Sequence, residues 1–338
     1  MTAVGVTHDE PSPALSRQLV KWLPPLLILV AIAGVVAVVP SVSSDENGRS
    51  WYRDTLGGSE LYRLNVLFAR LVPFLAGGSI AFALMQRRVW PARERHTVDT
   101  LQRHGITEVL IHWLNAIGIG LCLITAIWIL DWFGNPVSLE TTYVIHYLGA
   151  GFSVVAVAHH LTYQLVGGGR GLIARSRADV KNAIAEAVAY TGVYRGMPGV
   201  FGLQLPPAVR RPAQSVLRRL NLAPDRPGKY LATEKVVSYT GWAILVGIVV
   251  VTGVIKALNY IYSIPGWLLQ AMTFLHDGAT IFFVIMLVLH VGALVLVPRN
   301  WQLLKSMFTT RVSRRYAEEH LPLWAEEERQ SQSEPGGS

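Results

Sequence analysis

The sequence predicts an all-α integral membrane protein, built as a helical bundle with six transmembrane helices. Only 15% of its 338 residues are charged and 51% are hydrophobic, whereas soluble domains carry about 25% charged residues. The apolar residues form runs long enough to cross a ~30 Å hydrocarbon core as helices. Basic residues lie beside these runs, as expected for a chain embedded in a lipid bilayer.

Six apolar runs give the expected helices, and the second run is the weakest. Arg70 interrupts it, although a long arginine side chain can extend to the interface or find a partner. The expected spans are roughly 22–44, 64–86, 107–131, 141–166, 236–258 and 267–297.

The distribution of Lys and Arg orients the bundle. Basic residues are concentrated in 87–103, in 170–235 and after the last span, while the connections 132–140 and 259–275 contain none. The positive-inside rule therefore predicts a multi-pass protein of the bacterial cytoplasmic membrane with both termini cytoplasmic. The connection between the first two spans is a mild exception, because it carries three arginines beside four acidic residues.

The expected spans divide the chain into three parts. An N-terminal two-helix membrane extension covers 1–103, and a four-helix core covers 104–300. The core includes a long cytoplasmic loop, 167–235, and a cytoplasmic tail follows from 301 to 338.

The loop and the tail have their own patterns. Ser176 and Asp179 are typical of a helix start, and the Ala-rich run that follows to Tyr190 predicts a helix. The stretch 195–228 is rich in Pro, Gly and Arg, which predicts an irregular connector on the membrane surface. The polar tail after Glu326 is typical of disorder.

Composition excludes several chemistries. The single cysteine, Cys122, excludes a disulfide framework, an iron–sulfur cluster held by this chain and a covalently attached c-type haem. The sequence has no Rossmann glycine motif and no nucleophile constellation, so we expect no dehydrogenase active site on this chain. The net charge of +8 is explained by membrane topology, so the expected partner is a bilayer and not nucleic acid.

His276 and His290 lie fourteen residues apart in one apolar run. At ~100° per residue, fourteen steps come within ~40° of whole turns, so both imidazoles face the same way. At ~1.5 Å per residue they lie ~21 Å apart, one near each side of the hydrocarbon core. Such a helix can hold two metal centres stacked across a membrane, provided that partner histidines exist.

Partner histidines occur on two other expected helices. The topology places His146 with His276 at the outer side, and His112 with His290 at the cytoplasmic side. Imidazole in hydrocarbon is costly unless it is paired or metal-bound. Each pair would give bis-imidazole ligation of a b haem packed between helices. His160 also lies fourteen residues from His146, so it competes with His112 for the place opposite His290, and position alone does not decide.

Further motifs surround these histidines. They are Thr107–Trp113, Tyr143–His146, Gly228-Lys229-Tyr230, Thr252-Gly253 and the tail Arg311–Trp324. With them, the segment 105–298 resembles the gamma subunit of membrane-bound respiratory formate dehydrogenase, a four-helix dihaem cytochrome b. The His-Trp and Thr-Gly pieces are shared with hydrogenase-linked b-type cytochromes.

The resemblance implies a role for each histidine. His112 and His290 match the ligands of the cytoplasmic-side haem, and His146 and His276 match those of the outer haem. His160 has no ligand counterpart, so it is expected at the membrane interface, in contact with a haem propionate or the quinone.

The resemblance also implies partners and a direction of electron flow. A catalytic dehydrogenase subunit and an iron–sulfur subunit deliver electrons to the outer haem. The electrons then cross to the inner haem and reduce menaquinone or ubiquinone near the cytoplasmic face. The chain itself is then the electron-transfer subunit of a respiratory oxidoreductase complex.

This chain departs from the family pattern in two places. After Gly-Lys-Tyr, Leu231, Thr233 and Glu234 replace residues of more amide and glycine character, so Glu234 is either a proton relay or a helix-start acid. The two N-terminal helices have no counterpart in the four-helix core. Two alternatives stay open: a haem-free, histidine-bearing transporter or anchor subunit, and a transmembrane cytochrome that works alone.

Overall fold

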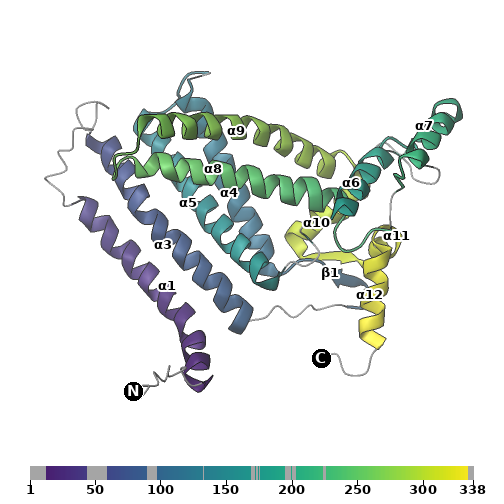
Figure 1. Cartoon of the computed structure of the whole chain (residues 1–338), viewed down its shortest axis with the longest axis horizontal. Coiled ribbons are helices and arrows are strands. Elements are labelled where there is room, and N and C mark those ends of the chain that lie inside the picture. Colours follow the sequence, from purple (N-terminus) through teal and green to yellow (C-terminus); the bar gives the residue numbers. More distant parts are fainter. Residues whose placement is uncertain are drawn as a thin grey trace, which may run out of the picture.

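The computed structural model describes residues 13–43, 59–89, 97–131, 133–168, 172, 174, 176–194, 199, 203–223 and 226–333. Figure 1 shows long helices side by side, with short helices and a small sheet gathered at one end. The elements of the helical bundle are α1 (Pro13–Ser43), α3 (Ser59–Val89), α4 (Ile106–Ile129), α5 (Leu139–Tyr163), η1 (Gln164–Gly168), η2 (Glu234–Gly241), α8 (Trp242–Leu258) and α9 (Gly266–Val295). The π-helical turns η1 and η2 extend α5 and lead into α8.

The apolar helices confirm the predicted fold class. Within the described residues, five segments are long and apolar enough to cross a membrane, and α1 adds a shorter apolar stretch, Trp22–Val38. The five are Leu64–Arg87, Ile106–Ile129, Leu139–Val166, Glu234–Leu258 and Gly266–Val295. Each predicted apolar run therefore falls within a helix, and the protein is an all-α integral membrane bundle.

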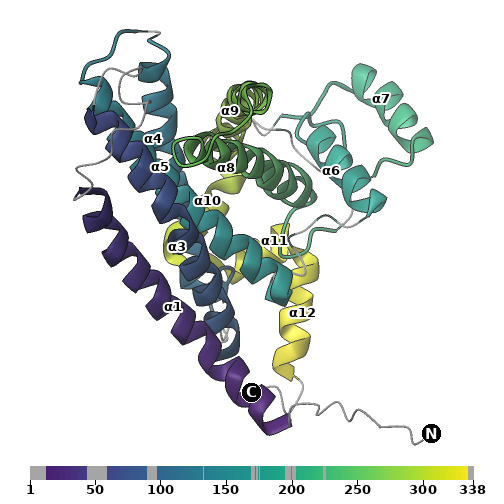
Figure 2. The same ribbon diagram turned by 60° about the vertical axis from the view of Figure 1, so that its left-hand side comes forward.

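The N-terminal pair α1–α3 packs against the core through α3 (Figure 2). A Cβ at Gly34 of α1 would overlap a phenylalanine ring of α3, so these two helices approach closely. Phe68 of α3 stacks on Tyr147 of α5 with ring centroids 4.6 Å apart. Near the other end of α5, Gln86 Oε1 lies 3.0 Å from His159 Nε2. The extension thus covers one side of α5 along most of its length.

The core consists of two helical hairpins, α4–α5 and α8–α9. A Cβ at Gly118 would lie 2.6 Å from the carbonyl oxygen of Gly149, and a Cβ at Gly149 would lie 2.5 Å from that of Gly118. Glycine at both positions is what permits α4 and α5 to touch here. Between the hairpins, close backbone contacts are sparse and run mainly from α5 to α8.

Helix α6 (Arg177–Ala189) begins where the sequence predicts. The Asp179 N–H donates to Ser176 Oγ at 3.1 Å, and the Ser176 N–H donates to Asp179 Oδ2 at 2.9 Å, which closes a capping box. Glu186 ties the helix to the membrane bundle, because its carboxylate accepts the N–H and the hydroxyl of Thr233 at 3.0 and 3.1 Å. Burial raises the pKa of Glu186.

Two segments predicted to be irregular are helical. The connector 195–228 contains α7 (Pro207–Arg219), in which Pro207 takes the first helical position, where its missing N–H leaves no bond unmade. The tail after Glu326 continues in α12 (Pro322–Ser333). Both predictions are wrong for these residues, because local composition does not reveal helical periodicity or distant packing. The last residues of the tail lie outside the described part of the chain.

The short elements form a compact region at one end of the bundle, which we call the polar cap. It comprises Thr97–Gly105, Arg226–Thr233 and Pro298–Ser333. Its further elements are β1 (Thr100–Gln102), η3 (Pro298–Asn300), α10 (Trp301–Thr309), β2 (Arg311–Ser313) and α11 (Arg314–His320). The two strands pair in antiparallel register. The apolar core of the cap consists of Leu101, Leu303, Val312, Tyr316, Ala317, Leu321, Trp324 and Ala325.

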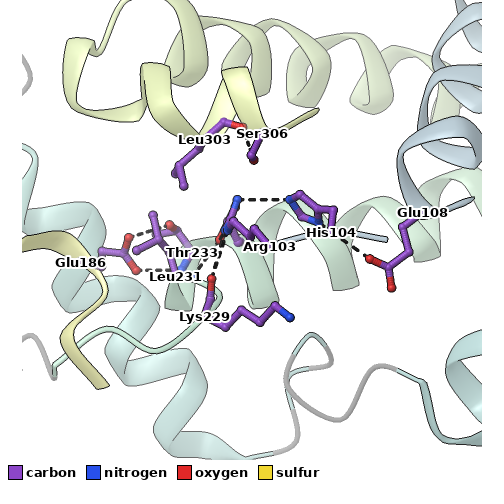
Figure 3. Close-up of polar contacts among 10 residues, drawn as sticks. Arg103, His104, Glu108, Glu186, Lys229, Leu231, Thr233, Leu303 and Ser306 are labelled. Atoms are coloured by element: carbon purple, nitrogen blue, oxygen red, sulfur yellow. Dashed lines mark hydrogen bonds and ion pairs between the residues drawn. The ribbon is translucent and has the colours of Figure 1, made fainter. Parts of the chain in front are cut away.

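Arg103 is the buried cation of the polar cap, with its side chain 2% exposed. Its Nη2 donates to both carboxylate oxygens of Glu234, at 2.9 and 2.6 Å. Its Nε donates to the Lys229 carbonyl at 3.3 Å, and Figure 3 shows Arg103 beside Lys229 and His104. Burial alone would lower the pKa of Arg103, but Glu234 outweighs it and the pKa is raised. Burial, with Arg103 beside it, also lowers the pKa of His104 well below its usual value. The ion pair joins the start of α4 to the start of η2.

Removing Arg103 should destabilise the protein. Arg103→Met leaves the Glu234 carboxylate, which is 25% exposed, without its counter-ion, at an expected cost of about 2–3 kcal/mol. The double variant R103M/E234Q removes both charges and should recover much of that loss. Thermal unfolding of the purified protein in detergent measures both effects.

The exposed pair Arg315–Glu319 gives a matched control. Both side chains are largely in water, so Arg315→Met should leave the unfolding temperature close to that of the parent protein. Equal losses in R103M and in R103M/E234Q would contradict the ion-pair explanation.

Candidate functional site

His146, near the start of α5, is held by a threonine on α4. Thr125 Oγ1 donates to the Leu121 carbonyl at 2.7 Å, so its hydroxyl proton is already used. The oxygen lies 2.9 Å from His146 Nδ1, and it therefore accepts the Nδ1–H. This bond assigns the tautomer: Nδ1 carries the proton, and Nε2 keeps a lone pair for another partner.

His276 on α9 is held in the same way by α8. Its Nδ1 lies 3.0 Å from the Val249 carbonyl, which can only accept, so Nδ1 carries the proton. Thr252 Oγ1 lies 3.0 Å from the same nitrogen and donates to the Ile248 carbonyl at 2.6 Å. A Cβ at Gly253 would lie 3.2 Å from His276 Cε1, so glycine lets the ring rest against α8. Nε2 of His276 is again the nitrogen left to bind.

His146 and His276 are close enough to interact electrostatically, although they belong to different hairpins. Each ring is oriented by its own hairpin, and each keeps an unprotonated Nε2. An imidazole with an unprotonated Nε2 is the form that ligates a metal ion, so both rings are suited to that role.

A second pair of histidines lies toward the polar cap. His112 on α4 is within electrostatic range of His290 on α9. The His290 ring stacks on Trp242 with centroids 5.5 Å apart, and Trp242 stacks on Phe283 at 4.9 Å. His112 meets the ring of Trp113 edge-on at 5.6 Å. Aromatic contacts are thus prominent around this pair, whereas the rings of the first pair are held by hydrogen bonds that they donate to threonine.

His160 and His159 have different surroundings. His160 lies within electrostatic range of His112, and its ring is 5.3 Å from that of Tyr239 at the end of η2. His159 is buried against α3, bonded to Gln86 and stacked on Tyr163 with centroids 5.9 Å apart. His160 therefore belongs to the neighbourhood of the inner histidines, whereas His159 belongs to the contact with the N-terminal extension.

Comparison with known proteins identifies the family. The family model described as prokaryotic cytochrome b561 matches residues 103–310, which is more than half of the chain. The chain belongs to the prokaryotic cytochrome b561 family. It is therefore a bacterial membrane-spanning b-type cytochrome, and the family implies electron transfer and the binding of b-type haem. No curated protein and no solved structure matches it.

The residues of this cytochrome b561 fit a haem. Among the described residues no group of three or more His, Cys, Asp or Glu side chains could hold a metal ion, but a porphyrin supplies four ligands and needs only one or two axial side chains. Two buried polar atoms, Asn115 Oδ1 near His112 and Trp242 Nε1 beside His290, have no hydrogen-bond partner in the described part of the chain. Buried polar atoms are normally paired, so these two suit contact with a bound polar group.

Thr125 and Trp242 do not stand out in the sequence, and Thr252 stands out only as part of the Thr252-Gly253 motif, which gives it no role. Thr125 and Thr252 are threonines inside apolar helices, where hydroxyls usually bond to their own backbone. The available signal is their offset, because each lies slightly more than twenty residues before a histidine of the next helix. Trp242 follows a glycine at the start of an aliphatic run, which gives no indication of its contact with His290.

Replacing either threonine should weaken haem retention to a similar extent. Thr125→Val removes the hydroxyl that accepts the His146 Nδ1–H, but the backbone of Cys122 also bonds to this ring, so retention should weaken by about 10-fold, the lower end for a lost outer-shell partner. Thr252→Val should have a similar effect, because the Val249 carbonyl likewise still accepts the His276 Nδ1–H. The haem-to-protein ratio after detergent washing, read from the reduced α band, measures both.

Thr273→Val is the matched control, since the Thr273 hydroxyl donates to the Leu269 carbonyl of its own helix at 3.0 Å. It should retain haem as the parent protein does. Equal losses in all three variants would mean that the effect comes from packing and not from the bonds to imidazole.

Proposed function

We propose that this cytochrome b561 is the membrane subunit of a respiratory oxidoreductase complex and carries electrons through two b haems. The observation that supports it best is that His146 approaches His276, and His112 approaches His290, from different hairpins of the bundle. His146 and His276 would ligate one haem, and His112 and His290 the other. A bound b haem supplies reversible one-electron reduction and oxidation.

The residues of the chain orient these ligands and set their environment. Thr125 and Thr252 hold the rings of His146 and His276, and a hydrogen bond at Nδ1 raises the basicity of the ligating Nε2. Around His290, the flat face of Trp242 restricts the ring from one side. Different surroundings would give two bound haems different potentials, and such a difference would favour one direction of transfer between them.

The direction of transfer follows from the resemblance to formate dehydrogenase gamma subunits and from the distribution of charge. We infer that both termini and the polar cap are cytoplasmic, because the basic residues are concentrated there. An iron–sulfur subunit linked to a catalytic dehydrogenase subunit would then donate at the outer haem. Menaquinone or ubiquinone would be reduced near the inner haem.

The segment Gly228-Lys229-Tyr230 supports a quinone site near the polar cap. It leads directly into η2, whose Glu234 lies within electrostatic range of His290. Glu234 is bound to Arg103 at 2.6 Å, so it acts foremost as a structural counter-ion. A carboxyl group near the proposed inner haem is suited to pass protons to a quinone when the quinone is reduced.

The haem count tests the proposal directly. A pyridine haemochrome assay on the purified cytochrome should give two b haems per chain. His276→Ala should lose the outer haem and retain an inner haem that still responds to quinol, as read from its reduced α band.

Fewer than two haems in the parent protein would overturn the dihaem proposal. An absence of Soret and α bands would instead favour a haem-free transporter or anchor. Turnover without any iron–sulfur partner would favour a cytochrome that works alone.

The variants of His160 and His112 separate the two possible inner pairings. His160→Ala should leave both haems in place, whereas His112→Ala should lose the inner haem, because His112 is expected to ligate it opposite His290. Haem content and the spectrum of the remaining haem distinguish these outcomes. His159→Ala serves as control, since this ring bonds to Gln86 of α3. Loss of a haem in His160→Ala, with both retained in His112→Ala, would reverse the assignment.

A further inference from the structure

We propose that α7 is an interfacial helix that binds the anionic lipid headgroups around the polar cap. The helix has 13 residues, Pro207–Arg219. At ~100° per residue, Val209, Ala213, Val216 and the following Leu220 fall within an arc of about 60°. The four arginines occupy the opposite half of the helix. They are Arg210, Arg211, Arg218 and Arg219.

The apolar face of α7 points away from the protein. Val209 and Val216 are each 55% exposed, and Leu220 is 57% exposed. Two hydrogen bonds join the polar face to the rest of the chain: Gln214 Nε2 donates to the Val193 carbonyl at 2.8 Å, and Arg210 Nη1 donates to a neighbouring glutamine at 2.7 Å. A helix of a water-soluble protein buries its apolar stripe and exposes its charges. In α7 the apolar stripe is exposed as well as the arginines Arg211, Arg218 and Arg219.

The position of α7 brings this face to the bilayer surface. The helix is attached through Val193 to the turn that ends α6, and Glu186 of α6 bonds to Thr233 at the start of the membrane span η2–α8. Figures 1 and 2 show α7 projecting beyond α6 at the end of the bundle where the polar cap lies. A helix tethered there is within reach of the lipid that surrounds the spans.

The charges of α7 identify the occupant as lipid with anionic headgroups. The helix carries four arginines and no acidic residue. Basic residues flanking an apolar face are the pattern of helices that lie in the plane of an anionic membrane surface. The bilayer already borders both membrane spans that the loop connects, so this surface continues an existing contact with lipid. The proposal does not depend on haem ligation.

Spin labels on the full-length cytochrome test the proposal. In a Cys122→Ser background, labels are placed at Val216→Cys on the apolar face and, as matched control, at Ser215→Cys on the adjoining polar face. The protein is reconstituted in nanodiscs of phosphatidylcholine alone or of an equal mixture of phosphatidylcholine and phosphatidylglycerol. Accessibility to oxygen reports the membrane interior, and accessibility to a water-soluble nickel complex reports the aqueous phase.

With phosphatidylglycerol present, the label at position 216 should become accessible to oxygen and protected from nickel, while the label at 215 stays accessible to nickel. The triple variant R211Q/R218Q/R219Q should lose this response. Access to nickel at both positions in both lipid mixtures would overturn the proposal. So would protection of position 216 from both reagents, because it indicates a protein partner. Equal insertion without phosphatidylglycerol would overturn the preference for anionic headgroups.

Discussion

A histidine inside a hydrocarbon layer has two ring nitrogens that need partners, and this requirement governs the core of the protein. In each hairpin the Nδ1–H of a histidine is accepted by oxygen atoms on the preceding helix. For His146 they are Thr125 and the backbone of Cys122, and for His276 they are Thr252 and the Val249 carbonyl. A shift of one helix along the other would leave a buried donor unpaired, at a cost of about 1–3 kcal/mol. The bond therefore fixes the ring and the register of the hairpin together.

The two hairpins meet this requirement in similar ways, with small residues beside the bond. In α4–α5, Gly118 and Gly149 bring the backbones into contact two turns or less from Thr125 and close to His146. In α8–α9, Gly253 lies directly against the His276 ring. Close approach of the backbones lets a threonine, whose side chain is short, reach an imidazole on the neighbouring helix. Each hairpin is thus organised on its own, and the sparse contact between hairpins leaves the pairing of histidines to whatever binds both.

An element that is stabilised by residues close to it in the sequence can be predicted, whereas one that depends on residues far along the chain cannot. The membrane spans and the capping box of Ser176 follow from local patterns, so they are predictable and confirmed. The polar cap is not, because β1 and β2 have three residues each and pair across more than two hundred positions of the chain. The tail beyond Glu326 is polar, yet it continues a helix anchored by Trp324, which is 2% exposed. Periodicity predicts where the histidines lie along their helices, whereas the hydrogen bonds that join them to threonines are visible only in the structure.

The buried pair Arg103–Glu234 connects the polar cap to the inner histidines. Arg103 precedes α4, which carries His112, and Glu234 opens η2, which leads to Trp242 and its stacking contact with His290. A fully desolvated guanidinium tolerates little displacement from its carboxylate, since separation would leave a charge without compensation. The start of α4 and the start of η2 are therefore held at a fixed spacing. Because close backbone contacts between the hairpins are otherwise sparse, this constraint limits how far the helices of His112 and His290 can move apart. The bond from Trp113 Nε1 to the Met307 carbonyl, 2.7 Å long, limits it further, because it ties α4 to α10, which follows α9.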